Sequence, residues 1–175
     1  GLGDVYKRQV SQRLFLTDGT FAANVAPGVP DAEIDRRRVT EALEAAQLGE
    51  FIASLPLGID TPVGECGSRL SGGQRQLLAL AKLLLIGPEL LLLDEPVSGL
   101  DPMVTAEMYE LIADINRSGV TVVMVTHDVS AALKYAGHIL CMRQGLTRES
   151  WFFGTPEEFL TSSGSDFLKG GAVNG

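Results

Sequence analysis

The chain has 175 residues, of which 14 are Lys or Arg and 22 are Asp or Glu, so its formal net charge at pH 7 is −8. This acidic balance argues against nucleic-acid binding, which requires clustered positive charge. Hydrophobic residues make up 45% of the sequence, enough for a core, yet no run reaches the roughly 18 to 20 apolar residues of a membrane-spanning helix. We therefore expect a soluble globular chain.

The first nine residues, GLGDVYKRQ, follow neither the helical nor the strand period, and we interpret 1–9 as a leader of uncertain origin. This stretch lacks the apolar core of a secretion signal. The two cysteines, Cys66 and Cys141, stand in unrelated contexts. Both features favour a reducing, cytoplasmic environment.

The first half of the chain is predicted to be helical. From Asp31, the segment IDRRRVTEALEAAQ predicts one helix, with Arg36–Arg38 on its solvated side. Its apolar stripe consists of Ile34, Ala42, Leu43 and Ala46. A second helical piece, LGEFIASL, ends at Pro56.

The second half alternates between the strand and helix periods. The predicted elements are a helix capped by Ser71 and ending near Ile86, a buried strand at 89–93, a helix capped by Asp101 and closed by Gly119, the strand VTVVMVT, a helix at 130–135, the strand HILCM, a strand-like WFFG and a helix opened by a capping box at Thr155. This alternation predicts an α/β fold with a mainly parallel sheet and crossover helices.

Two adjacent acids mark the end of the strand at 89–93. Ligands gather at the carboxyl ends of parallel strands, where Asp94 and Glu95 directly follow four leucines. A carboxylate is costly to bury unless a cation or water faces it. One interpretation is an acid that holds Mg²⁺ beside another that polarises water. The other is a structural turn before Pro96.

Two further segments are candidates for phosphate contacts. His127 follows VTVVMVT at a carboxyl edge, where it is either a structural histidine or a group beside phosphate or the attacking water. Ser71, Gly72, Gly73 and Gln74 open a helix, whose free N–H groups and positive dipole end favour an anion. An ordinary N-cap followed by flexible glycines is the alternative.

The sequence disfavours a metal site at His138 and Cys141 and lacks a phosphate-binding loop. His138 and Cys141 have a spacing that a metal site could use, but in a strand the two side chains point to opposite faces. The sequence G-x-x-x-x-G-K-[ST], which cradles nucleotide phosphates, does not occur in these 175 residues.

Four motifs, taken together, resemble the ATPase domain of ABC transporters: LSGGQRQ (70–76), LLLLDEP (90–96), SGLD (98–101) and THD (126–128). By resemblance they are the signature motif, the Walker B strand, the D-loop and the segment of the switch histidine, while Gln12 matches the Q-loop glutamine. The resemblance implies a partial P-loop NTPase fold over residues 10–160. The helical subdomain and signature helix would occupy 10–87, the catalytic part 88–160 and a flexible tail 161–175.

The resemblance also implies a site shared between two ATPase domains that meet head to tail, with ATP and Mg²⁺. By this resemblance, Ser71 and Gly73, with Gly72 and Gln74 of the same motif, would contact the γ-phosphate of the partner's nucleotide. Asp94 would position Mg²⁺ through water, Glu95 would act on the attacking water, and His127 would contact the γ-phosphate. Gln12 would sense the metal and the membrane subunit, and Asp101 would link the two sites. Such domains work at the cytoplasmic face of the membrane, under transmembrane permease subunits.

The two halves resemble different branches of this family. FIASLPLGIDTPVGECGSR is similar to exporters and lipid-linked-sugar flippases, in which TPVGE (61–65) touches the membrane domain. VTHDVSAALKYAGHILCM is similar to the ATPase subunits of zinc and manganese importers. We expect metal import first, with export of a lipid or lipid-linked oligosaccharide as the alternative.

Two further hypotheses concern other functions. A domain without a Walker A loop is expected to be inactive alone and would only complete the ATP site of a partner. DNA-repair and chromosome-organising ATPases share a signature helix, but the acidic charge and the lack of long coiled-coil heptads disfavour them.

Overall fold

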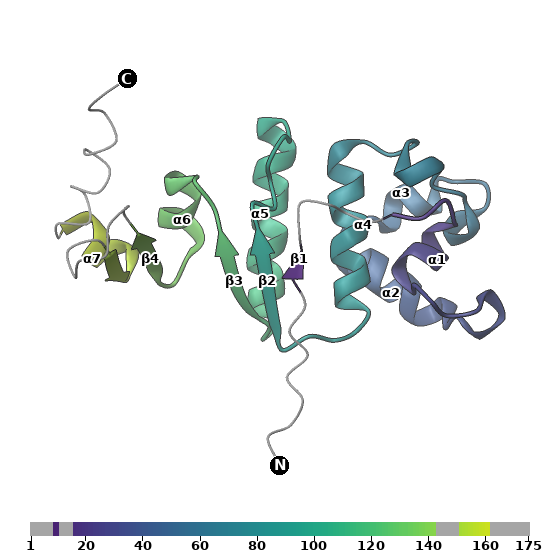
Figure 1. Cartoon of the computed structure of the whole chain (residues 1–175), viewed down its shortest axis with the longest axis horizontal. Helices are drawn as coiled ribbons and strands as arrows, with labels where there is room; N and C mark the ends of the chain where they lie inside the picture. The colour runs from purple at the N-terminus through teal and green to yellow at the C-terminus, as the bar shows by residue number, and fades with distance from the viewer. Residues whose placement is uncertain (1–8, 11–15, 143–150, 162–175) are drawn as a thin grey trace, which may run out of the picture. The chain divides into compact units, whose positions relative to one another are not determined.

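The computed structural model describes residues 9–10, 16–142 and 151–161 (Figure 1). The chain divides into two compact units, Gly1–Val125 and Thr126–Gly175. None of the helices within these described ranges is both long and apolar enough to span a bilayer.

The helical part of the first unit is built around α4 (Gly72–Leu84), which packs against α1 (Phe21–Val25) and α2 (Arg36–Ala45). The short helix α3 (Gly49–Ala53) packs against α2. Single 3₁₀ turns lie at Asp31–Glu33, Gly58–Asp60 and Glu65–Gly67. The largest fully buried side chains of this core are Phe21, Val25, Val39, Leu43, Leu48, Val63 and Leu78.

The helix predicted from Asp31 is interrupted at Ile34. A 3₁₀ turn ends there, and α2 begins only after Asp35, whose carboxylate accepts a hydrogen bond of 3.1 Å from the backbone N–H of Arg38. Ile34 is nevertheless buried, as the apolar stripe predicts. The side chain of Asp35 therefore starts a new helix within a continuous apolar pattern.

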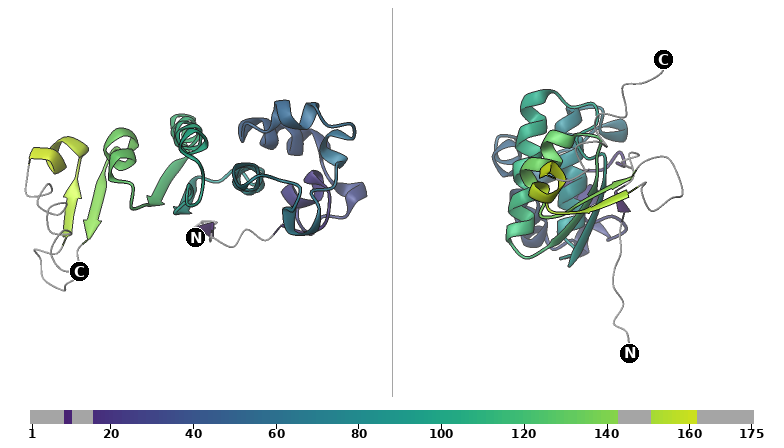
Figure 2. Two further views of the ribbon diagram at one scale, coloured as in Figure 1. Left: turned by 90° about the horizontal axis from the view of Figure 1, so that it is seen from above. Right: turned by 90° about the vertical axis from the view of Figure 1, so that its left-hand side faces the viewer.

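The sheet of the first unit has the order β1–β2–β3, with all three strands parallel. The strands are β1 (Gln9–Val10), β2 (Leu90–Asp94) and β3 (Thr121–Val125). Gln9, the last residue of the predicted leader, pairs with Leu92. The helix α5 (Pro102–Arg117) connects β2 to β3 and lies on one side of these two strands (Figure 2).

The strand ELLLL was expected to be buried, and among the described residues only one of its faces is. Leu91 and Leu93 are buried against Met108 and Ile112 of α5. The other side chains of β2 are half-buried, and the neighbouring Val123 of β3 is 50% exposed. The alternation follows from the period of two in a strand with a helix on one side.

The second unit contains α6 (Val129–Tyr135), β4 (Ile139–Met142), β5 (Trp151–Gly154) and α7 (Pro156–Thr161). HILCM was expected to join the parallel sheet, and the pairing that the described residues show for this strand is antiparallel, between β4 and β5. The rings of Phe152 and Phe159 meet edge to face at 5.2 Å and join β5 to α7. The capping box at the start of α7 is confirmed, because the side chains of Thr155 and Glu158 bond each other's backbone N–H groups.

Candidate nucleotide site

The end of β2 places two acids at the carboxyl edge of the parallel sheet. Asp94 is the last residue of β2, pairs with Val125 and is half-buried. Glu95 follows with a φ of 47°, in the left-handed region that non-glycine residues rarely adopt. Its Oε2 atom is shielded from solvent. A backbone conformation of this kind costs about 1–3 kcal/mol and is found preferentially at functional sites.

Backbone hydrogen bonds fix Glu95 in this conformation. Its N–H donates to the carbonyl oxygen of Val125 over 2.9 Å, and its own carbonyl accepts from the N–H of Ser98 over 3.1 Å. The predicted turn therefore exists. A turn does not exclude a chemical role, because the bonds that form it use only the backbone of Glu95.

The amino end of α4 carries a complete capping box. The Oγ of Ser71 accepts from the N–H of Gln74 over 3.2 Å, and Oε1 of Gln74 accepts from the N–H of Ser71 over 2.9 Å. Ser71 is exposed. Its hydroxyl accepts in this box and still has its own hydrogen to donate, so the cap is compatible with an anion contact.

The two glycines of the signature segment differ in their surroundings. Gly73 is buried, and a Cβ added to it would lie 2.7 Å from Cγ1 of Val104 in α5. Gly72 is half-buried, and its added Cβ would lie 3.5 Å from Cδ2 of Leu100, an ordinary contact. Flexibility and anion access were the reasons predicted for both glycines, and the structure adds packing at Gly73. No sequence pattern signals this contact with Val104.

Asp101 caps α5, as predicted. Its Oδ1 accepts hydrogen bonds from the N–H groups of Met103 (3.0 Å) and Val104 (3.1 Å), and Pro102 occupies the first helical position. The side chain of Asp101 is exposed. This cap is its structural role in the described chain.

His127 belongs to the second unit and is exposed. It lies between the end of β3 and α6, which Asp128 caps by accepting from the N–H of Ala131 over 3.0 Å. Gln12, the remaining predicted site residue, lies outside the described residues.

The donor set at the end of β2 fits Mg²⁺. Carboxylate oxygens are suitable ligands, and Mg²⁺ bound with a nucleotide takes one or two carboxylates, with phosphate and water as its other ligands. Asp94 and Glu95 supply two such carboxylates. The described residues contain no group of three or more His, Cys, Asp or Glu side chains that could hold a metal by themselves. The arrangement therefore fits a metal that arrives with phosphate.

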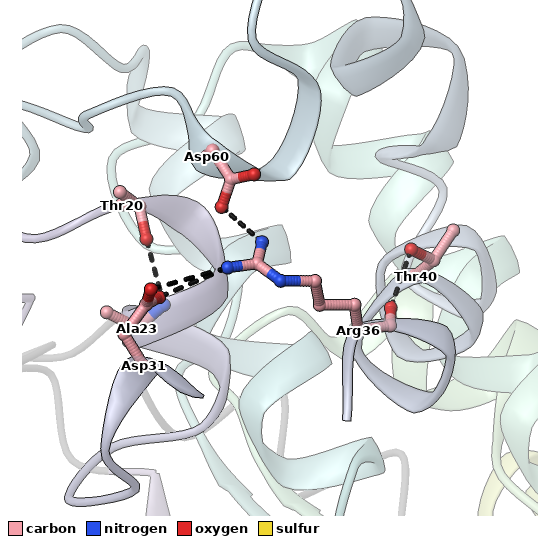
Figure 3. Close-up of polar contacts among 6 residues, drawn as sticks. All are labelled: Thr20, Ala23, Asp31, Arg36, Thr40 and Asp60. Atoms are coloured by element: carbon pink, nitrogen blue, oxygen red, sulfur yellow. Dashed lines mark hydrogen bonds and ion pairs between the residues drawn. The ribbon is translucent and has the colours of Figure 1, made fainter. Parts of the chain in front are cut away.

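Arg36 is a residue whose role the sequence did not reveal. Its guanidinium lies between Asp60, to which it is hydrogen-bonded, and Asp31, at 3.3 Å (Figure 3). The hydrogen bond to Asp60 raises the pKa of Arg36 above its ordinary value. The prediction of a solvated arginine is thus incomplete, because this half-exposed side chain joins α2 to the segment before TPVGE.

The TPVGE loop is hydrogen-bonded to the start of α1 and to the residues just before it. The N–H of Phe21 donates to the carbonyl of Thr61, and the N–H of Val63 donates to the carbonyl of Gly19, each over 3.1 Å. Asp18 accepts from the N–H of Cys66 over 3.1 Å. The loop is therefore fixed at both ends to residues that come shortly after Gln12 in the sequence.

The sequence model of the family described as ABC transporter matches residues 7–98. A second family model, described as AAA domain, putative AbiEii toxin, Type IV TA system, matches residues 64–133.

Similar proteins include the ATP-dependent lipid A-core flippases of Ralstonia nicotianae, 40% identical over 156 residues (89% of this chain, 26% of the relative), and of Chromobacterium violaceum, 41% identical over 140 residues (80% and 23%). The ABC-type transmembrane transporter verA of Clonostachys rogersoniana is 37% identical over 175 residues, which is 98% of this chain and 14% of the relative. The chain thus spans about a quarter or less of these relatives.

Among solved structures, a bacterial Atm1-family ABC exporter with ATP bound is similar in fold, with a TM-score of 0.73 and 30% identity. The match covers 95% of this chain and 28% of that one. The fold, the acids at the end of β2 and the signature segment agree with the family match, which extends over more than half of the chain. The chain belongs to the ABC transporter ATPase family.

Proposed function

We propose that the chain is the signature- and Walker B-bearing part of an ATPase that powers export of a lipid or lipid-linked molecule. Support comes from the flippase relatives, whose alignments cover up to 89% of the chain and so extend through both of its halves. Import of zinc or manganese, which the catalytic half favoured, finds no support among these relatives. Exporter-like sequence therefore continues beyond LSGGQRQ.

The observation that carries the proposed hydrolytic role is the end of β2, where backbone hydrogen bonds hold Glu95 in a rare conformation beside Asp94. In the proposed reaction, water attacks the γ-phosphorus of ATP, the bond to the β-phosphate oxygen breaks, and ADP and phosphate leave. Glu95 accepts the proton of the attacking water. Bound Mg²⁺ would neutralise charge on the phosphates, with Asp94 holding it through water.

The signature segment would act on a nucleotide held by another domain. Ser71 donates its hydroxyl hydrogen to the γ-phosphate while its oxygen keeps the cap on α4, and the N–H groups of Gly72 and Gly73 lie at the positive end of the helix. His127 and Gln12 contribute contacts to the phosphate and to the metal, and Asp101 connects the two sites. These roles rest on the family motifs.

The proposed partners are a second ABC ATPase domain, arranged head to tail, and a transmembrane part, either fused or separate. The chain would then lie at the cytoplasmic face of a membrane. The TPVGE loop is the proposed contact with the transmembrane part, because it matches the family's contact loop and its backbone is hydrogen-bonded to Gly19 and Phe21.

A second candidate function is completion of a partner's ATP site without hydrolysis. It is favoured by the lack of G-x-x-x-x-G-K-[ST] in the 175 residues, since this loop holds the β- and γ-phosphates. The purified chain is then expected to show no ATP turnover alone. Turnover equal to that of an intact ABC ATPase would contradict the argument from the phosphate loop.

An exchange in two hosts tests the main proposal. In the first host, residues 10–160 of this chain replace the matching segment of the Ralstonia nicotianae flippase, and the product is called the flippase chimera. In the second host, the same residues replace the matching segment of a zinc importer ATPase subunit. We expect transport-coupled ATP hydrolysis in the flippase chimera only. Coupled hydrolysis in the importer host alone would overturn the assignment to export, and inactivity of both hosts would overturn the hydrolytic role.

A further inference from the structure

The amino ends of two helices, α4 and α5, meet at one tight contact within the first unit. At Gly73 a methyl group in place of hydrogen would come within 2.7 Å of Cγ1 of Val104, closer than real Cβ atoms approach a neighbour. Both positions lie in the first turn of their helix. The absence of a side chain at Gly73 therefore sets how closely the two helix starts approach.

The backbone at Gly73 does not explain why a glycine stands there. Gly73 is not among the residues with positive φ, and it lies within an α-helix, where alanine is the favoured residue. The neighbour is also stiff, because a β-branched side chain in a helix has one strongly preferred χ1 rotamer. Relief of an added methyl group would thus require one helix start to move.

The position of Val104 is itself fixed by Asp101. The same Oδ1 atom of Asp101 accepts from the N–H of Met103 and from the N–H of Val104. On the other side of the contact, Gly73 stands between Ser71 and Gln74, whose side chains form the reciprocal cap of α4. The contact thus connects the cap of one helix with the cap of the other.

We propose that Val104 is a positioning residue, which through Gly73 holds the signature end of α4 at a fixed place relative to Asp101. The proposal rests on the proposed function, since its consequence is that Ser71 and Asp101 reach the two ATP sites of a closed dimer together. This coordination requires no direct contact between the side chains of Ser71 and Asp101. Val104 acts only through packing.

Hydrogen exchange of the 175-residue chain tests the contact without any nucleotide. In Gly73→Ala, we expect the amides of Gln74 and Val104, each held by a capping oxygen, to exchange about tenfold faster relative to the amide of Ile112 in the core of α5. Gly73→Ala with Val104→Ala, which removes the clashing methyl groups, is expected to restore both amides.

Gly72→Ala is the matched control, because its added Cβ meets Leu100 only at ordinary contact distance. This variant should leave the protection of Gln74 and Val104 unchanged or increased. Equal acceleration in both glycine variants would overturn the contact, as would a uniform acceleration that includes Ile112. If Gly73→Ala is too unstable for exchange measurements, the double variant still tests the contact. Its free energy of unfolding must then exceed that of Gly73→Ala.

The flippase chimera tests the functional consequence. Gly73→Ala should reduce its ATP hydrolysis by about tenfold or more, and the added Val104→Ala should recover part of the loss. Restored amide protection without any recovery of hydrolysis would overturn the positioning role. If the unsubstituted chimera hydrolyses no ATP, the proposed function fails and the positioning role with it, whereas the exchange experiment still shows whether the contact exists.

Discussion

The backbone N–H of Glu95 donates a hydrogen bond of 2.9 Å to the carbonyl oxygen of Val125, which extends the β2–β3 ladder by one residue. The bond fixes a non-glycine residue in the left-handed region, where a φ of 47° costs about 1–3 kcal/mol. Thr126 and His127 follow Val125 in the sequence. The acid with the proposed water-activating role is therefore bonded to the strand that precedes His127, the proposed switch histidine.

Replacement of this acid by its amide separates binding from hydrolysis. In the flippase chimera, Glu95→Gln should bind ATP with unchanged affinity and hydrolyse it about 10²- to 10⁴-fold more slowly, because an amide does not accept a proton from water. Equilibrium nucleotide binding and phosphate release provide the two measurements. Glu107→Gln, on an exposed position of α5, is the matched control and should hydrolyse normally. Undiminished hydrolysis in Glu95→Gln would reassign Glu95 to a purely structural turn.

A charge at Ser71 separates capping from phosphate binding. Aspartate is as good an N-cap as serine, and its charge suits the positive end of α4, so Ser71→Asp should leave the free energy of unfolding within about 0.5 kcal/mol of wild type. The same carboxylate repels the γ-phosphate. ATP-dependent dimerisation of the chimera's ATPase domains should therefore weaken strongly, as measured by sedimentation velocity. If dimerisation is as tight as before, Ser71 is a cap and nothing more.

Gln47 is a site where a glycine should stabilise the chain. Its φ is 58°, and the bonds from its N–H to Glu44 and from the N–H of Leu48 to Leu43 form the helix-ending motif that usually contains glycine. Gln47→Gly removes the left-handed strain of an exposed residue, and part of the gain is offset by added freedom in the unfolded chain. We expect about 0.5–1 kcal/mol of stabilisation in urea unfolding. Gln47→Ala, which keeps the strain, should give no such gain.

The capping box of α7 predicts an acid-sensitive element. Hydrogen bonds from the backbone and side chain of Thr155 lower the pKa of Glu158 below its ordinary 4.5, and the charge of His138 adds to this. A carboxyl group with a lowered folded-state pKa stabilises the fold fully above its unfolded pKa, and the contribution disappears as pH falls through the folded value. The protection of the α7 amides should therefore decrease below about pH 4.5.

Glu158→Gln is the variant that checks this pH dependence. Glutamine also serves at this position of a capping box, so the helix should remain while its titration disappears. Amide exchange measured from about pH 6 to about pH 3 compares the variant with the unsubstituted chain, a range that spans the ordinary carboxyl pKa. Identical pH profiles in the two proteins would contradict the assignment of the lowered pKa to this cap.

Local signals predicted the helix starts well. Ser71, Asp101 and Thr155 were each predicted as caps, and each forms the expected side-chain bonds, because capping depends on residues within four positions. The break at Ile34 was missed, since a buried isoleucine continues the apolar stripe across a turn.

Long-range features were beyond the reach of the sequence pattern. The alternation in HILCM is the same for a strand that joins a parallel sheet and for one that pairs antiparallel with β5. The contact between Gly73 and Val104 joins segments far apart in the chain, and a glycine in a signature motif is explained equally well by anion access. The left-handed conformation of Glu95 also has no signal in LLLLDEP.

The most direct test of the central claim is ATP-dependent association of the 175-residue chain with a second ABC ATPase domain. This partner domain carries a G-x-x-x-x-G-K-[ST] loop, and its own signature serine is replaced by arginine. Sedimentation velocity measures the complex with and without ATP. We expect a one-to-one complex to form with ATP and Ser71→Asp to prevent it, because the only intact signature segment in the mixture belongs to this chain. A complex that forms equally without ATP, or that tolerates Ser71→Asp, would contradict the claim that this chain completes a partner's nucleotide site.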